Sequence, residues 1–107
     1  SPAPGSVADM TVIATLEMRF NPDSLDDARA LFATELVRTR EFDGCHGVEV
    51  LVDATDPCHW VAHETWESMA HDAAYREFRA GPGKIAGLGP MLAAAPVLTH
   101  YVVDPAI

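Results

Sequence analysis

The chain has 107 residues, of which 49% are hydrophobic and 21% charged, and seven Lys and Arg against sixteen Asp and Glu give a net charge of −9. This length and composition predict one globular domain with a single core and are atypical of a disordered chain. The excess of acidic residues argues against nucleic acid or an anionic membrane surface as a partner.

The first nine residues contain neither a basic region nor an apolar stretch, so we expect a flexible tail over residues 1–9 and no signal peptide. No run of about 18 apolar residues occurs, which argues against a membrane-spanning helix. We therefore expect a single domain over residues 10–107 and a cytoplasmic location.

The first half of the chain predicts a strand, a helix and a second strand. Apolar and polar residues alternate over residues 10–20, which indicates a strand. An Asn-Pro-Asp turn ends this pattern. Ser24 is then the expected N-cap of a helix over residues 25–40, where apolar residues follow helical spacing. Alternating valines predict the second strand over residues 48–53.

The second half predicts two more strands around another helix. Turn residues at 54–57 and a strand over residues 59–66 predict an antiparallel hairpin with the second strand. Ser68 is the expected N-cap of a helix over residues 69–79, which a Gly-Pro-Gly sequence ends. A glycine-containing segment then predicts short helical turns and a loop, followed by a last strand over residues 97–103.

The resulting order, β-α-β-β-α-β, predicts an α+β, ferredoxin-like fold with a four-stranded antiparallel sheet and both helices on one face. The strands carry apolar residues on both faces, for example Ile13 near Leu16 and Tyr101 beside Val102. Because two helices cover only one face, we expect a second copy of the chain to cover the other in a homodimer packed sheet on sheet.

The cysteines and histidines do not form a metal-binding pattern. Cys45 and Cys58 lie at opposite ends of the predicted hairpin, about 20 Å apart at the usual rise of a strand, so we expect two free thiols. His59 and His63 have a spacing that brings side chains together on a helix but not on a strand. Phosphate-binding and dinucleotide-binding motifs are also absent, so we expect no metal and no bound cofactor.

The end of the third strand and the helix after it contain the candidate site. Glu64 and Trp66 share one face of the strand, and His71 and Tyr75 lie four residues apart on the helix. The short turn between the two elements brings Trp66 within reach of Tyr75. These residues are typical of an aromatic pocket wall for a small molecule, and the same pattern also fits aromatic residues of the core.

Several stretches of the chain resemble the antibiotic biosynthesis monooxygenase (ABM) family. They are Val12-Ile-Ala-Thr-Leu-Glu17, Thr39-Arg40 with Gly44-Cys45, and Glu64-x-Trp66-x-Ser68. The resemblance runs from about Met10 to Val103 and implies a dimeric α+β barrel of two ferredoxin-like protomers. It also implies oxidation of aromatic phenols to quinones by O₂ without flavin, haem or metal.

The chain departs from the family pattern at three positions. Many members have a histidine nine residues after the strand tryptophan, where this chain has Tyr75. Ala62 and Asp72 stand where the actinorhodin-type branch has asparagine and tyrosine. Trp66 and Glu64 therefore carry over from the resemblance, whereas the groups that handle protons in the family do not.

We therefore predict a cofactor-independent monooxygenase that oxidises a small aromatic or polyketide-like substrate with O₂. In this hypothesis Trp66 forms the pocket wall and contacts a substrate oxygen, and Tyr75 is the polar contact opposite. The base is His71, His63 or Glu64. Two alternatives stay open: a non-catalytic, ligand-binding dimer and a haem-degrading relative that would use His71, the only histidine on a predicted helix.

Overall fold

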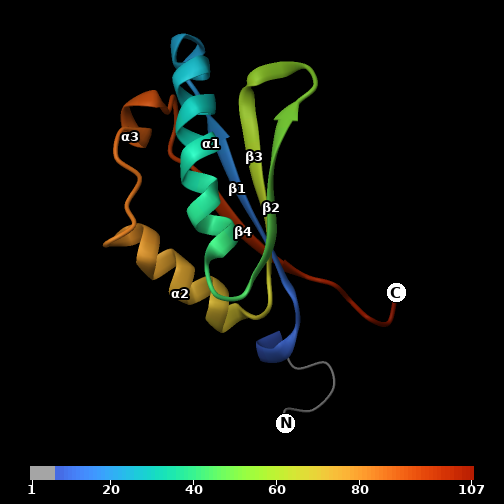
Figure 1. The fold of residues 1–107 in the computed structure, drawn as a ribbon. Helices are drawn as coiled ribbons and strands as arrows, with labels where there is room; N and C mark the ends of the chain where they lie inside the picture. The colour runs from blue at the N-terminus through green and yellow to red at the C-terminus, as the bar shows by residue number, and fades with distance from the viewer. Residues whose placement is uncertain (1–6) are drawn as a thin grey trace.

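The computed structural model describes residues 7–107 and has the predicted order of elements (Figure 1). The expected tail, residues 1–9, falls outside the described residues except for Val7–Asp9, which form the short 3₁₀ helix η1. The strands are β1 (Val12–Arg19), β2 (Cys45–Asp53), β3 (Asp56–Trp66) and β4 (Val97–Val102). The helices are the 3₁₀ helix η2 (Pro22–Ser24), α1 (Leu25–Glu41), α2 (Met69–Ala80) and the short α3 (Leu88–Met91).

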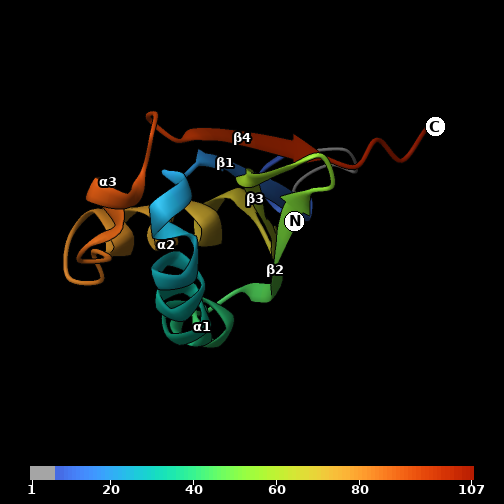
Figure 2. The same cartoon turned by 90° about the horizontal axis from the view of Figure 1, so that it is seen from above.

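The four strands form one antiparallel sheet in the order β2-β3-β1-β4. Figure 2 shows α1 and α2 on the same side of this sheet. This arrangement confirms the predicted α+β, ferredoxin-like fold. Because β2 and β4 remain as open edges, the sheet of one chain does not close into a barrel.

Alternation along β1 decides which residues face the helices. Val12, Ala14 and Met18 are buried and Leu16, of the same alternating set, is half-buried, whereas the residues that alternate with this set are half-buried or exposed. Successive side chains of a strand point to opposite faces, so the first set lies under the helices and the second on the open face. β3 follows the same rule, with alternate buried residues from Trp60 to Trp66.

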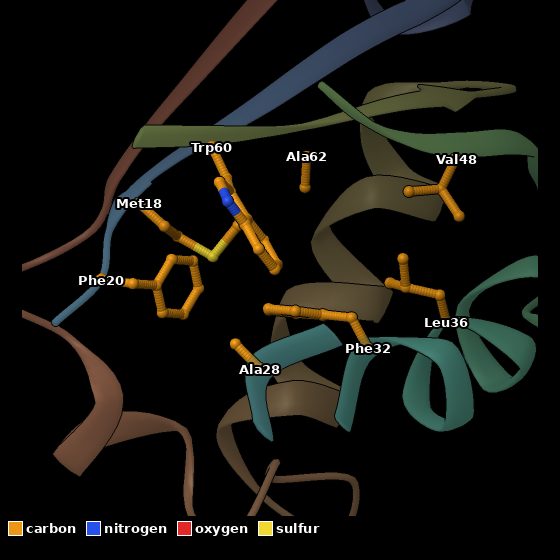
Figure 3. Close-up of a cluster of buried hydrophobic side chains, with 8 residues drawn as sticks. All are labelled: Met18, Phe20, Ala28, Phe32, Leu36, Val48, Trp60 and Ala62. Carbon is orange, nitrogen blue, oxygen red and sulfur yellow. The ribbon is translucent and has the colours of Figure 1, made fainter. Parts of the chain in front are cut away.

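The larger buried cluster joins the sheet to α1, and we call it the α1 cluster (Figure 3). The helix contributes three residues at four-residue intervals, which lie on one face of a helix. Three aromatic rings pack together in this cluster: Phe20 meets Phe32 of α1 edge to face, and the Phe20 and Trp60 ring centroids lie 4.6 Å apart in a tilted arrangement. The members are Met18, Phe20, Ala28, Phe32, Leu36, Val48, Trp60 and Ala62.

The smaller cluster lies at the α2 end of the sheet, and we call it the α2 cluster. It consists of the buried residues Val12, Ala14, Trp66 and Tyr75. Its rim is formed by half-buried residues that include Phe42, whose ring centroid lies 5.3 Å from that of Tyr75. The hydrophobic core is therefore divided between the two helices.

The two predicted helix caps differ in outcome. The Ser68 side chain accepts a hydrogen bond from the backbone N–H of His71, as expected of an N-cap. Ser24, by contrast, has helical backbone angles and makes no capping hydrogen bond. Pro22 occupies the first position of η2, and its restricted φ favours a helical turn that begins before Ser24. Ser24 therefore stands at the predicted N-cap position of α1, but its side chain does not cap the helix.

The strand β2 begins at Cys45, three residues before the predicted start. A register shift between Cys45 and Gly47 interrupts the alternation that sequence patterns rely on. The turn before β2 contains Gly44, whose φ is 84°. Any other residue at this position would place its Cβ atom against the His71 ring. The close approach of α2 to this turn therefore depends on a glycine.

Both cysteines are free, as predicted. Cys45 pairs with Trp66 at one end of the hairpin, while Cys58 lies near the turn at the other end. Burial raises the pKa of the Cys45 thiol, which keeps it protonated and unreactive near neutral pH. Within residues 7–107, no helix is long and apolar enough to cross a membrane.

Candidate functional site

A cavity of about 270 Å³ lies between the sheet and the helices, and we call it the central cavity. Its apolar walls come from both helices, from β1 and β3, and from the segment that connects α2 to β4. Five polar or charged residues also line this cavity. They are Glu64 from β3, Tyr75, Arg76 and Arg79 from α2, and Lys84 from the connecting segment.

Glu64 is the only carboxylate that lines the central cavity within the described residues, and it is 3% exposed. Its Oε1 atom accepts a hydrogen bond from Trp66 Nε1 at 3.0 Å and is also paired with the Arg76 guanidinium. The described residues provide no hydrogen bond to its second oxygen, Oε2. Glu64 can therefore accept a hydrogen bond or a proton from a ligand in the cavity.

A second carboxylate lies next to this pair. Asp72 is 2% exposed, and its Oδ1 accepts hydrogen bonds from Arg76 at 3.0 and 3.2 Å. Its Oδ2 lies 2.6 Å from His100 Nε2 on β4. Burial acts to lower the pKa of Arg76, but the charges and hydrogen bonds of Glu64 and Asp72 outweigh burial, so the pKa is raised. Arg76 therefore stays charged between two carboxylates.

Sequence reasoning missed both Arg76 and His100. The spacing of Asp72 and Arg76, four residues apart on a helix, is a recognisable signal for an ion pair. No comparable signal exists for His100, because it lies 28 residues from Asp72 on another element.

The Tyr75 hydroxyl is fixed by two neighbours. It lies 2.7 Å from Thr39 Oγ1 of α1, and Arg79 Nε donates to it at 2.8 Å. Arg79 also donates to Thr39 Oγ1 and to the backbone carbonyls of Glu35 and Gly83. Arg79 therefore ties α1 and the segment after α2 to the wall of the central cavity.

Trp66 and Tyr75 lie on the same side of the sheet, with ring centroids 4.7 Å apart. Tyr75 lines the central cavity, but Trp66 is fully buried and does not. The expectation that Trp66 forms the pocket wall is therefore wrong. Trp66 is the last residue of β3, where Tyr75 and Phe42 cover its ring and its N–H is occupied by Glu64.

The two candidate histidines lie away from the central cavity. His71 Nδ1 is 2.7 Å from the Ser68 hydroxyl at the start of α2. His63 stands between Ala62 and Glu64 on β3, so its side chain points to the open face of the sheet. Of the three residues considered as the base, the structure therefore brings only Glu64 to the cavity.

A second hollow of about 290 Å³ lies between α1 and β2, and we call it the outer groove. Arg29, Arg40 and Trp60 line it, and none of the residues predicted for the site does. Across residues 7–107, no three Cys, His, Asp or Glu side chains are arranged to hold a metal ion.

Residues 11–83 match the family model described as antibiotic biosynthesis monooxygenase. Several solved structures share the fold. A protein from Nitrosomonas europaea, designated a candidate antibiotic biosynthesis monooxygenase, is 14% identical with a TM-score of 0.79 over 89% of this chain and 91% of that one. A Mycobacterium tuberculosis protein is 25% identical with a TM-score of 0.71 over 91% and 99%.

A conserved protein from Methanosarcina mazei is 15% identical, with a TM-score of 0.77 over 91% of this chain and 96% of that one. No curated protein matches the chain. At these levels of identity the structural matches establish the fold, while the family match rests on residues 11–83.

Proposed function

Because the chain belongs to the antibiotic biosynthesis monooxygenase family, we propose that it oxidises a small aromatic or polyketide-like substrate with O₂ and without a bound cofactor. The observation that carries this proposal is the central cavity, in which a buried carboxylate and a fixed tyrosine hydroxyl face apolar walls. Such a site suits a small ligand with an apolar body and few polar groups.

The proposed reaction uses the substrate as the source of electrons. Glu64 removes a proton from the phenolic substrate, and the resulting anion passes one electron to O₂. The substrate radical and superoxide combine to form a C–O bond, and protonation gives a hydroperoxide. Loss of water then leaves a C=O group, so one oxygen atom enters the product, the other leaves in water, and the oxidised carbon loses two hydrogens.

The contacts of Glu64 support its role as the base. Trp66 and Arg76 both engage Oε1, and this leaves Oε2 for the substrate. Trp66 is then a positioning residue that acts through Glu64. The Tyr75 hydroxyl supplies a second polar contact, and the apolar walls exclude water, which favours formation of the substrate anion next to fixed charges.

The geometry favours this proposal over haem degradation. Haem binding needs an axial ligand that faces a large cavity, and no histidine of residues 7–107 lines the central cavity. Its volume of about 270 Å³ lies at the lower limit of sites for drug-sized ligands, roughly 300–1,000 Å³.

The test is O₂ uptake by the full chain with anthrone-like phenols, followed together with the absorbance of the quinone product. We expect Glu64→Gln to lower turnover by about a hundredfold or more, because a positioned general base contributes that much. Glu77→Gln on the exposed side of α2 is the matched control and should leave turnover unchanged. No O₂ uptake by the unsubstituted protein, or full activity in Glu64→Gln, would contradict the proposal.

We also propose that two copies of the chain pack through their open sheet faces. Leu51, Val97 and Tyr101 lie on this face and are 47%, 54% and 54% exposed. Burial of these side chains against a second copy removes apolar surface from water. Light scattering should give about twice the 11.5 kDa mass of one chain, and a single-chain mass at micromolar concentration would contradict this assembly.

A further inference from the structure

The central cavity collects positive charge in a protein that has little of it. The chain contains only seven Lys and Arg and has a net charge of −9. Three of the seven, Arg76, Arg79 and Lys84, line this one cavity, together with a single carboxylate, Glu64. A cationic cavity in an acidic protein raises the local concentration of anionic ligands relative to the rest of the surface.

Two of these cations already have partners within the protein. Arg76 pairs with Glu64 and Asp72, and Arg79 lies 3.6 Å from a carboxylate oxygen of Glu35. The remaining donors of Arg79 are used by backbone carbonyls and hydroxyls. Their charges are therefore largely offset by protein carboxylates, and they hold the cavity wall in place.

Lys84 differs from both arginines. It is exposed, it lies on the segment between α2 and α3, and no carboxylate of residues 7–107 stands within ion-pair distance of its ammonium group. The neighbouring wall is apolar, with Ile85 from the same segment and Leu88 from the start of α3. The ammonium group is thus an uncompensated charge on the solvent side of a cavity whose carboxylate, Glu64, is buried.

We propose that the central cavity binds an aromatic phenol that carries a second, anionic group such as a carboxylate, and that Lys84 recognises this group. This inference rests on the proposed function for the position of the phenol beside Glu64. The anionic group then lies at the outer end, away from Glu64, where like charges would repel. Lys84 is a specificity-determining residue, because a compact ammonium suits a carboxylate while apolar walls accept the ring.

Binding of two matched probes to the full chain tests the proposal without turnover. The probes are 6-hydroxy-2-naphthoate, whose hydroxyl and carboxylate lie at opposite ends of the ring system, and 2-naphthol, which lacks the carboxylate, both titrated by fluorescence under nitrogen. We expect the carboxylated probe to bind about tenfold more tightly at low salt, which corresponds to about 1.4 kcal/mol. This preference should fall as ionic strength rises.

Variants assign the preference to Lys84. Lys84→Met should reduce the affinity for 6-hydroxy-2-naphthoate to that for 2-naphthol, while Lys84→Arg should retain most of the preference. Arg29→Met, in the outer groove, is the matched control and should change neither affinity. The proposal is overturned if neither probe binds, if both bind equally, if Lys84→Met keeps the preference, or if Arg29→Met removes it.

Failure of the anion site and failure of the proposed monooxygenase function would give different results. Turnover of neutral and carboxylated phenols at equal efficiency would reject the role of Lys84 and keep the monooxygenase. A Lys84-dependent preference in a protein that consumes no O₂ would keep the anion site and reject the monooxygenase.

Discussion

Both buried clusters of this protein lie between a helix and the sheet, but they differ in the polarity of the side chains around them. The α1 cluster consists of aliphatic and aromatic side chains, and its one indole N–H donates to the backbone carbonyl of Pro57. The α2 cluster is surrounded by three buried polar residues, Thr39, Glu64 and Asp72. Buried carboxylates are costly unless they are paired, so the α2 end gains less stability from the residues it buries.

This difference identifies which end of the molecule is specialised. A fold that needed only a core could fill both ends as it fills the α1 end. The α2 end instead keeps two carboxylates under the helix, where Arg76 and His100 compensate them, and one of these carboxylates, Glu64, lines the central cavity. The α1 cluster contributes only apolar side chains to the same cavity. Buried polar groups next to a cavity are typical of a site for ligands. Each of the following substitutions tests one side of this comparison.

The largest effect on stability is expected in the α1 cluster. Phe20 is 1% exposed, contacts Trp60 and Phe32, and lines neither cavity. Phe20→Ala should therefore lower the free energy of unfolding by about 3–5 kcal/mol, measured by urea denaturation. Phe20→Leu, which keeps most of the volume, should cost less than about 1.5 kcal/mol. A loss below about 1 kcal/mol in Phe20→Ala would show that this end is not the main core.

The second-largest loss of stability is expected when Arg76, the cation of the buried ion pairs at the α2 end, is removed. Arg76→Met leaves Glu64 and Asp72 without their shared partner, and we expect unfolding free energy to fall by about 3 kcal/mol. Arg29→Met removes an exposed pair with Asp26 and should cost less than about 1 kcal/mol. Equal losses in the two variants would contradict a special role for the buried pairs.

The two tryptophans provide a matched pair across the clusters. Trp60→Phe and Trp66→Phe each remove one hydrogen bond, to a backbone carbonyl and to Glu64 respectively, and each should cost about 1–2 kcal/mol of stability. Only Trp66→Phe should lower kcat, by about tenfold, because it repositions Glu64. KM should change little, since the Trp66 ring does not line the cavity.

An equal loss of kcat in both tryptophan variants would contradict this division of roles. Unchanged turnover in Trp66→Phe would remove the indole N–H from the proposed mechanism and leave Trp66 as a core residue.

The smallest effect on stability is expected for His59, which pairs with carboxylates on the open face of the sheet. Unlike the pairs of Arg76, these pairs are partly exposed to solvent. His59 lies between Asp53 at 2.9 Å and Glu17 at 3.1 Å, with Arg19 nearby. Hydrogen bonds to Asp53 and Glu17 raise the pKa of His59, and the hydrogen bond to His59 lowers the pKa of Asp53 to about 2. The open face therefore holds an ion pair near pH 5.

The stabilising contribution of this pair should depend on pH in a defined direction. It is fully present below the unfolded-state pKa of His59, 6.5, and is lost as pH rises through the higher folded-state value. It is also lost as pH falls from 3.8 towards about 2, where Asp53 is protonated. The Tm difference between the unsubstituted protein and His59→Gln should thus shrink from pH 5.5 to pH 8.5. A Tm difference that grows over this range would contradict the stabilising role of the pair.

Local periodicity determined the elements of this fold. The alternation over residues 10–20 and the helical spacing over residues 25–40 reproduce β1 and α1 closely, because each burial pattern depends on neighbours in sequence. The start of β2 was not predictable in this way, since the irregularity at Gly47 breaks the alternation. Likewise Ser24 has the composition of a cap but is already part of a helical turn.

The candidate site was predictable only in part. Glu64 and Tyr75 were found from strand and helix spacing, and both line the central cavity. The role expected of Trp66 as a wall depended on where the helix crosses the end of β3, which spacing does not encode. The contacts of Tyr75 with Thr39 and of Asp72 with His100 span 36 and 28 residues of sequence.

The sequence by itself determined the order of the elements, the alternating faces of β1 and the free thiols, because these follow from periodicity and from distances along a hairpin. Only the tertiary structure decided which charges meet. Pairs such as Asp72 with His100, and the gathering of Arg76, Arg79 and Lys84 around one cavity, arise where separate elements pack together. Side-chain contacts of this kind depend on crossing angles and strand register, and a single sequence carries no local signal for either.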